Sequence, residues 1–261
     1  MKKQILFALA FVLGTWNIAS AHDTWVQTAS LVSRQGEFVY VDLMLGNHGN
    51  GHRDFKLASK ITLAPCSLVL IAPDGSKSDL KPSVLDMGSA EKEGFWTARY
   101  VAEQKGLYQV VHTLDTLHGK TRAIKSSKTY FFATDNYQTI ATTGVDTIAP
   151  LNHGLEFTVD SPIEKLGAGK ELRLRLLWNG KPLPETRVSF IPRGAVLAEG
   201  FDSQFERNTD ANGYVSYTPT QGNFILAVAH HIAADEKGEG YDKTHYGATT
   251  VLPVPQSAYV K

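Results

Sequence analysis

Residues 106–133 read GLYQVVHTLDTLHGKTRAIKSSKTYFFA and contain two strand-like runs in close succession. Gly106–Leu114 and Ser127–Ala133 are rich in β-branched and aromatic residues. Neither run holds apolar residues at the spacing i, i+3, i+4 and i+7 that an amphipathic helix requires. Lys105 and Gly106 supply a turn signal in front of the first run. This stretch therefore predicts β-strands.

The same pattern continues on both sides of this stretch, with glycine, proline and asparagine turns between the runs. The predicted strands before it are Thr24–Val32, Glu37–Leu45, Ser67–Ala72 and Phe95–Ala102. Those after it are Leu155–Val159, Glu171–Trp178, Thr186–Ile191, Gly213–Tyr217, Asn223–His231 and His245–Leu252. Short strands without intervening helices favour packed antiparallel sheets.

The sequence therefore predicts an all-β protein with two immunoglobulin-like β-sandwich domains in tandem and little helix. The polar, turn-rich interval 135–150 is the predicted linker. The N-terminal domain is expected at 22–140 and the C-terminal domain at 151–261.

The first 21 residues have the features of a cleavable export signal. Lys2 and Lys3 provide the positive start, Ile5–Leu13 the short apolar core and Ala19–Ala21 the small-residue cleavage site. The apolar run is too short for a comfortable membrane span, which takes about 20 residues. We therefore expect a periplasmic mature chain that begins at His22 and has no membrane span.

Charge and motifs exclude several classes of protein. The formal net charge is 0, and loss of Lys2 and Lys3 would leave a slight acidic surplus, so no nucleic-acid partner is expected. The single cysteine, Cys66, follows Pro65 and precedes an apolar run, which predicts a buried small hydrophobe. No nucleophile elbow, phosphate loop or His-Glu-x-x-His motif is present, and we predict a non-enzymatic protein.

His22 is the first candidate metal ligand. After cleavage it would carry an α-amino group and an imidazole on one residue, and an α-amino group has a pKa near 7.7 to 8.0. A divalent ion therefore displaces its proton readily at neutral pH. Nitrogen ligands of this kind suit copper, nickel or zinc. The alternative is a histidine that the signal peptidase merely tolerates.

Four more histidines extend this candidate site. His48 and His52 lie four residues apart in the glycine-rich stretch 46–52, predicted to be a loop, where glycines let the backbone wrap around an ion and Asp54 could orient one imidazole. His231 and His245 could face each other across a hairpin that carries several acidic residues. Neighbouring strand residues point to opposite faces, so His230 and His231 are not expected to share one ion.

Other histidines are weaker candidates. His112 lies within an apolar strand, where a hydrogen-bonded structural role is the commoner one, and His118 and His153 lie beside glycines in turns. An ordinary exposed loop at 46–52 and a solvated hairpin before His245 are the alternative interpretations.

The chain resembles an exported bacterial family, a domain of unknown function described as nickel-uptake-associated periplasmic proteins. The resemblance covers essentially the whole mature chain. Its motifs are residues 21–25 (AHDTW), 46–52, 179–184 (NGKPLP), 209–213 (TDANG) and the closing 230–231 pair (HH). It implies a periplasmic accessory to nickel or cobalt uptake that works beside a membrane metal transporter. The matching histidines are His22, His48, His231 and His245.

Three functions compete on this sequence. The first is metal capture and delivery through His22 and one or more of His48, His52, His231 and His245, with nickel first and copper, cobalt or zinc as other ions. The second is a non-enzymatic module that binds a glycan or a protein. The third is a copper redox enzyme that uses the N-terminal histidine.

Overall fold

A computed structural model describes residues 22–49, 52–140 and 143–259, and the predicted export signal lies outside them. The prediction of an all-β fold is confirmed. Within the described residues the helical elements are single 3₁₀ turns, at Lys81–Ser83, Val145–Thr147 and Ile163–Lys165. Among the same residues, no helix has the length and apolar character needed to cross a membrane.

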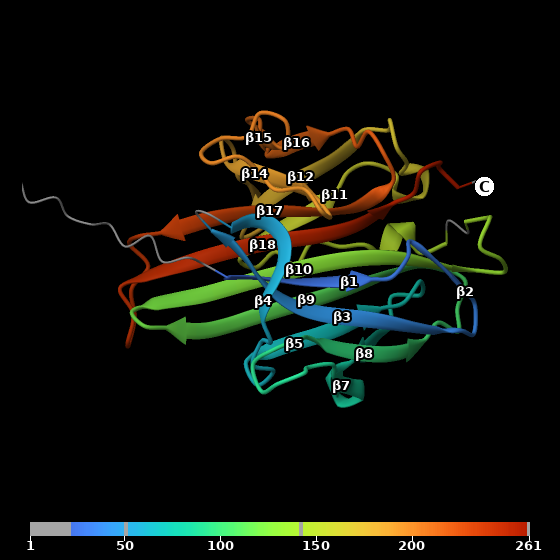
Figure 1. Cartoon of the computed structure of the whole chain (residues 1–261), viewed down its shortest axis with the longest axis horizontal. Coiled ribbons are helices and arrows are strands. Elements are labelled where there is room, and N and C mark those ends of the chain that lie inside the picture. Colours follow the sequence, from blue (N-terminus) through green and yellow to red (C-terminus); the bar gives the residue numbers. More distant parts are fainter. Residues whose placement is uncertain (1–21, 50–51, 141–142, 260–261) are drawn as a thin grey trace, which may run out of the picture.

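A nine-stranded sheet forms the middle layer of the molecule (Figure 1). Its strands, in spatial order, are β15 (Glu206–Asn208), β14 (Arg187–Pro192), β17 (Asn223–Ala233), β18 (Lys243–Val254), β10 (Thr121–Thr134), β9 (Gly106–His118), β5 (Cys66–Ile71) and β6 (Lys77–Asp79), and β2 (Val32–Arg34) pairs with β10. The β9/β10 and β17/β18 turns and the start of β1 lie at the same end, on the left in Figure 1.

Two smaller sheets cover this layer. The first contains β1 (His22–Thr28), β3 (Phe38–Gly49), β8 (Trp96–Val101), β7 (Val84–Asp86) and β4 (His52–Ser59). The second contains β11 (Leu155–Val159), β12 (Leu172–Trp178), β13 (Lys181–Pro182) and β16 (Tyr214–Tyr217). We call them the N-terminal and C-terminal sheets.

Alternation along β10 explains why the outer sheets lie on opposite faces, because successive strand residues point to opposite sides. Phe131 packs with Val41 of β3 in one core, whereas Phe132 packs with Phe157 of β11 in another. All these side chains are buried. The central sheet is thus apolar on both faces, and each outer sheet encloses its own core against it.

Strand β10 joins the two halves of the chain. It pairs with β18 in parallel, from Thr121 beside Lys243 to Thr129 beside Val251. The expected purely antiparallel sheets are therefore wrong for the central layer, which is mixed. The central sheet contains strands from both sides of the predicted linker at 135–150. The division into two separate tandem sandwiches is therefore not confirmed.

A second link between the halves is polar. The guanidinium of Arg53 on β4 forms an ion pair with Glu206 on β15, and both side chains are buried. Ser189 of β14 also donates a hydrogen bond to Glu206, at 2.6 Å. The carboxylate is therefore satisfied from both halves of the chain.

A buried ion pair also lies under the C-terminal sheet. Lys128 on β10 is 1% exposed, and its Nζ lies 2.6 Å from Oε2 of Glu156 and 3.0 Å from the carbonyl oxygen of Phe157. Glu156 accepts two further hydrogen bonds, from the backbone N–H groups of Leu151 and Asn152. Burial lowers the pKa of Lys128, although Glu156 opposes that shift. The hydrogen bonds hold the start of β11 on the central sheet.

Candidate functional site

Strand β1 begins at His22 and then lies buried between the N-terminal and central sheets. His22 is exposed, whereas the next six residues are buried. The backbone N–H of Val26 donates to Oγ of Ser127, at 2.9 Å, and the Thr249 hydroxyl donates to the carbonyl oxygen of Thr24, at 2.8 Å. These bonds fix β1 on β10 and β18, so the position of His22 is set by the central sheet.

His112 takes a structural role in this arrangement. Its Nδ1 lies 2.9 Å from the carbonyl oxygen of Ser67 and its Nε2 lies 3.0 Å from the Thr24 hydroxyl. Burial lowers the pKa of His112 to about 4. A neutral imidazole therefore ties β5, β9 and β1 together, which agrees with the structural interpretation of this residue.

Asp23 connects β1 to the end of β17. Its carboxylate is 1% exposed, and its two oxygens lie 2.8 and 3.0 Å from Nε2 of His230. Nζ of Lys125, on β10, lies 3.5 Å from the same carboxylate. A buried carboxylate therefore faces an imidazole and an ammonium group.

His245 lies next to this group because of the β17–β18 register. His230 is opposite Gly247, so His245, two residues along β18, shares its face of the sheet. The ring centroids of His230 and His245 are 5.1 Å apart. Burial, assisted by Lys125 and His230, lowers the pKa of His245 to about 3. At neutral pH its imidazole is uncharged, as a metal ligand must be.

A cleft of about 380 Å³ opens beside these residues. Its polar lining includes His22, His118, Lys125 and His245. Its apolar lining consists of Leu45, Ile61, Pro65, Leu114, Leu117 and Ala123. The cleft is the open end of the space between the N-terminal and central sheets, and it places the predicted residues His22 and His245 in one wall.

The predicted pairing of His231 with His245 is wrong. His231 is opposite Tyr246, and its ring lies 4.3 Å from that of Trp178 in the C-terminal sheet. Since adjacent strand residues alternate, His230 and not His231 shares a face with His245. Glu236, in the acidic loop between β17 and β18, accepts a hydrogen bond from the Tyr246 hydroxyl at 2.7 Å.

The predicted glycine-rich loop at 46–52 is largely strand. β3 continues to Gly49 and β4 begins at His52, with His48 opposite Arg53 and Gly49 opposite His52. The side chains of His48 and His52 lie outside the described part of the structure. The register nevertheless places the backbone of Asn47 opposite His22, so His48 follows the residue that faces the candidate N-terminus.

Gly46 serves packing in this hairpin. A Cβ at Gly46 would lie 2.2 Å from Cζ3 of Trp25 and 2.7 Å from the carbonyl oxygen of Lys56. No side chain fits between a buried indole and a backbone carbonyl at those distances. The expected wrapping of this glycine around an ion is replaced by the close approach of Trp25.

The donor atoms present are few. Imidazoles with one carboxylate are ligands of the kind that nickel, cobalt, copper and zinc accept. Within the described residues, however, no group of three or more histidine, cysteine, aspartate or glutamate side chains is close enough to hold a metal ion. Sequence reasoning preferred His231 to His230 and did not name Asp23 or Lys125 as site residues. The position of Asp23 next to His22 was the one signal that could have identified Asp23.

Cys66 fulfils its prediction. It is 5% exposed, its Sγ donates to the carbonyl oxygen of Thr62 at 3.3 Å, and burial raises its pKa to about 11. The thiol is therefore a poor metal ligand at neutral pH.

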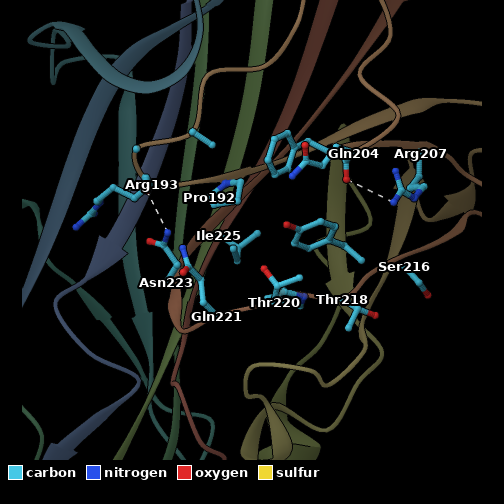
Figure 2. A pocket seen from close by; sticks show the side chains of 15 residues that line it. Pro192, Arg193, Gln204, Arg207, Ser216, Thr218, Thr220, Gln221, Asn223 and Ile225 are labelled. Carbon is cyan, nitrogen blue, oxygen red and sulfur yellow. Dashed lines mark hydrogen bonds between the residues drawn. The ribbon is translucent and has the colours of Figure 1, made fainter.

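A larger cavity of about 590 Å³ lies at the beginning of β17, far along the strand from His230. Figure 2 shows hydrogen bonds between Arg193 and Asn223 and between Gln204 and Arg207 in its lining. The Asn223 amide donates to the carbonyl oxygen of Arg193, at 3.1 Å, and Arg207 donates to that of Gln204, at 3.4 Å. We place the candidate site at the smaller cleft because His22, His118 and His245 line it, whereas no histidine is among the described residues that line the larger cavity.

Comparison with solved structures finds low overall similarity to several multi-strand proteins. A DUF4785 family protein from Legionella pneumophila is 11% identical with a TM-score of 0.30, over 78% of this chain and 52% of that one. The chain thus spans about half the length of that protein. Salmonella alpha-2-macroglobulin is 15% identical with a TM-score of 0.27, over 94% of this chain and 16% of that one. The D0-D1 domain of Intimin is 15% identical with a TM-score of 0.23, over 89% and 98%.

Comparison with curated proteins gives no significant match. A family profile, in contrast, matches residues 19–233, which include β1, the β3–β4 hairpin and His230. The match covers most of the chain. The chain therefore belongs to the family described as Domain of unknown function (DUF4198).

Proposed function

We propose that this chain is an exported periplasmic protein that binds a divalent transition-metal ion. In this proposal it acts without catalysis, as an accessory to nickel or cobalt uptake beside a membrane metal transporter. The observation that carries the proposal is the convergence of three histidines on one end of the central sheet. His22 and His245 line one cleft, and His230 lies against His245.

The chemistry of these groups supports ligation. His245 is uncharged at neutral pH, because burial holds its pKa near 3. Asp23 binds Nε2 of His230, as the carboxylates behind metal-ligating histidines do, so coordination by His230 would use Nδ1. After signal cleavage, His22 would add an amino nitrogen to its imidazole.

The remaining predicted histidines divide between two groups. His48 and His52 belong to the hairpin whose register faces His22, and we retain them as additional ligands. His231 packs against Trp178 on the far face of the central sheet, with the two rings tilted by 52°. We assign His231 no role in this site and replace it with His230.

Calorimetric titration of the protein that begins at His22 tests this proposal. Nickel is the first probe, followed by cobalt, copper and zinc under the same conditions. Loss of a ligand that donates one of a few metal bonds should weaken nickel binding by about tenfold or more. We expect this for His22→Ala, His230→Ala and His245→Ala.

His231→Ala is the matched control, because it removes an imidazole from the adjacent position on the same strand. It should leave nickel affinity unchanged. A second variant retains Ala21, which blocks the α-amino group of His22 while keeping every side chain. Absence of binding for all four ions, or equal affinities for the His230→Ala and His231→Ala variants, would contradict the proposal.

A further inference from the structure

The cleft is larger than a metal ion requires. Its volume of about 380 Å³ compares with roughly 30 Å³ for one water molecule in the liquid. The described side chains also lack a complete set of three metal ligands. The site thus combines too few donor atoms with space for an organic molecule.

Two lysines, Lys60 and Lys125, belong to the lining of the cleft. Lys125 is 4% exposed, and its ammonium lies 3.5 Å from Asp23, whose carboxylate is closer to His230. A buried ammonium at this distance from its partner has capacity for a second one. Lys60, across the cleft, is already paired with Asp86 at 2.7 Å. Lys125 is therefore the cation that an incoming carboxylate would meet.

Room for this ammonium depends on Gly247. A Cβ at that position would lie 2.6 Å from Nζ and 2.7 Å from Cδ of Lys125. The strand passes so close to Lys125 that only glycine leaves its extended side chain undisturbed. Gly247 on β18 therefore leaves room for the side chain of Lys125.

The apolar walls define the rest of the ligand. Leu45, Ile61 and Leu114 line the cleft with carbon atoms. Such walls accept the carbon skeleton of a small molecule, and His22 and His245 belong to the same lining. A hydrated ion alone would leave this apolar surface in contact with water.

We propose that the cleft binds a small organic polycarboxylate together with the metal ion. One carboxylate binds the Lys125 ammonium, and the others complete the coordination that the histidines begin. The transported species would then be a metal chelate and not a bare ion. This inference rests on the proposed metal-binding function.

Native mass spectrometry and calorimetry with nickel and citrate test the inference. Citrate in solution competes for nickel, so a bare-ion site should bind nickel more weakly when citrate is added. We expect the reverse. A 1:1:1 complex of protein, nickel and citrate should appear, and citrate should tighten nickel binding by about tenfold, the value of one charge-assisted hydrogen bond.

The Lys125→Met variant isolates the ammonium. The ratio of nickel dissociation constants without and with citrate should fall to about one or below, whatever the variant's affinity for nickel alone, because one charge-assisted hydrogen bond is lost. Lys105→Met is the matched control, since that lysine is half exposed and pairs with Asp135 at the start of β9. If Lys125→Met fails to fold, Gly247→Ala displaces the ammonium with all charges retained.

Two failures remain distinguishable. Nickel binding that citrate only weakens, with no ternary complex, would overturn the chelate inference and leave the metal proposal intact. Absence of nickel binding both with and without citrate would overturn both.

Discussion

Two buried lysines on β10 lie three residues apart and face opposite sides of the central sheet. Lys128 points under the C-terminal sheet, where Glu156 lies 2.6 Å from its Nζ and the Phe157 carbonyl 3.0 Å away. Lys125 points under the N-terminal sheet, where its carboxylate partner is 3.5 Å away. The two side chains are 1% and 4% exposed, so their burial does not distinguish them.

The difference lies in how closely each ammonium is paired with its carboxylate. Glu156 is held by an ammonium and two backbone N–H groups, and its partner Lys128 also has a carbonyl. Nε2 of His230 lies near both oxygens of Asp23, and Lys125 shares one of these oxygens with His230. The closely bonded pair of Lys128 and Glu156 has a structural role. Lys125 lies farther from its carboxylate partner and beside the cleft, where we propose that it binds a ligand.

The largest effect should come from breaking the pair of Lys128 and Glu156. Lys128→Met should cost about 3–5 kcal/mol of unfolding free energy, because Glu156 stays buried without its ammonium. Lys125→Met should cost clearly less, since Asp23 keeps His230. Urea denaturation of both variants measures the difference. Equal losses would remove the distinction, and a Lys128→Met/Glu156→Gln double variant should recover part of the stability.

A smaller effect is expected from a change at Asp23. Asp23→Asn keeps the shape of the side chain but removes its charge, and we expect a loss of about 1–3 kcal/mol in stability. Nickel affinity should fall by about 10- to 100-fold, because His230 loses its orienting acceptor. Asp235→Asn, which changes an exposed acid in the β17–β18 turn, should alter neither quantity. Asp23→Asn with normal nickel affinity would show that Asp23 is purely structural.

The pH dependence of stability should show that His112 has a structural role. The folded protein keeps His112 neutral until pH about 4, whereas the unfolded imidazole titrates near 6.5. The unfolded state thus binds more protons as the pH falls through this window, and stability is lost. Between pH 7 and 5, wild type should lose about 2 kcal/mol more than His112→Gln does. Parallel pH profiles for the two proteins would contradict this.

The smallest effect on stability should come from Gly247→Ala. The added methyl meets Nζ and Cδ of Lys125, the far end of a flexible side chain that can move away. We expect a loss below about 1 kcal/mol in urea, within the range of ordinary substitutions. The citrate effect on nickel binding should nevertheless disappear. A loss as large as that of Lys128→Met would show that Lys125 cannot be displaced.

Much of the secondary structure was predictable from local pattern. Leu155–Val159 has the predicted bounds, and the runs in 106–133 became β9 and β10 with extended ends. The end of β3 was predicted as a loop because of the glycines at 46, 49 and 51, although Gly46 accommodates Trp25, and β4 was not predicted. The parallel β10–β18 pairing was missed for another reason. Local pattern carries no information about which distant strands become neighbours.

Part of the lining of the cleft was predictable from the sequence, but the full set of residues around it was not. His22 and His245 were identified and do line one cleft. The choice between His230 and His231 depends on the register of β17 against β18, which shifts every side chain to the other face if it moves by one residue. Lys125 gave no signal, because its significance comes from Asp23 and Gly247, both distant in the sequence.

The hydrogen bond between Thr249 and Thr24 spans 225 positions of the chain, and the one between Thr129 and Val251 spans 122. Contacts of such separation close large loops and form slowly. The hydrogen bond that holds β1 on β18 therefore cannot form until β18 has been synthesised. A chain that stops before residue 243 would lack both His245 and the Thr249 hydroxyl that binds β1, so His22 and His245 can meet only once β18 has been made.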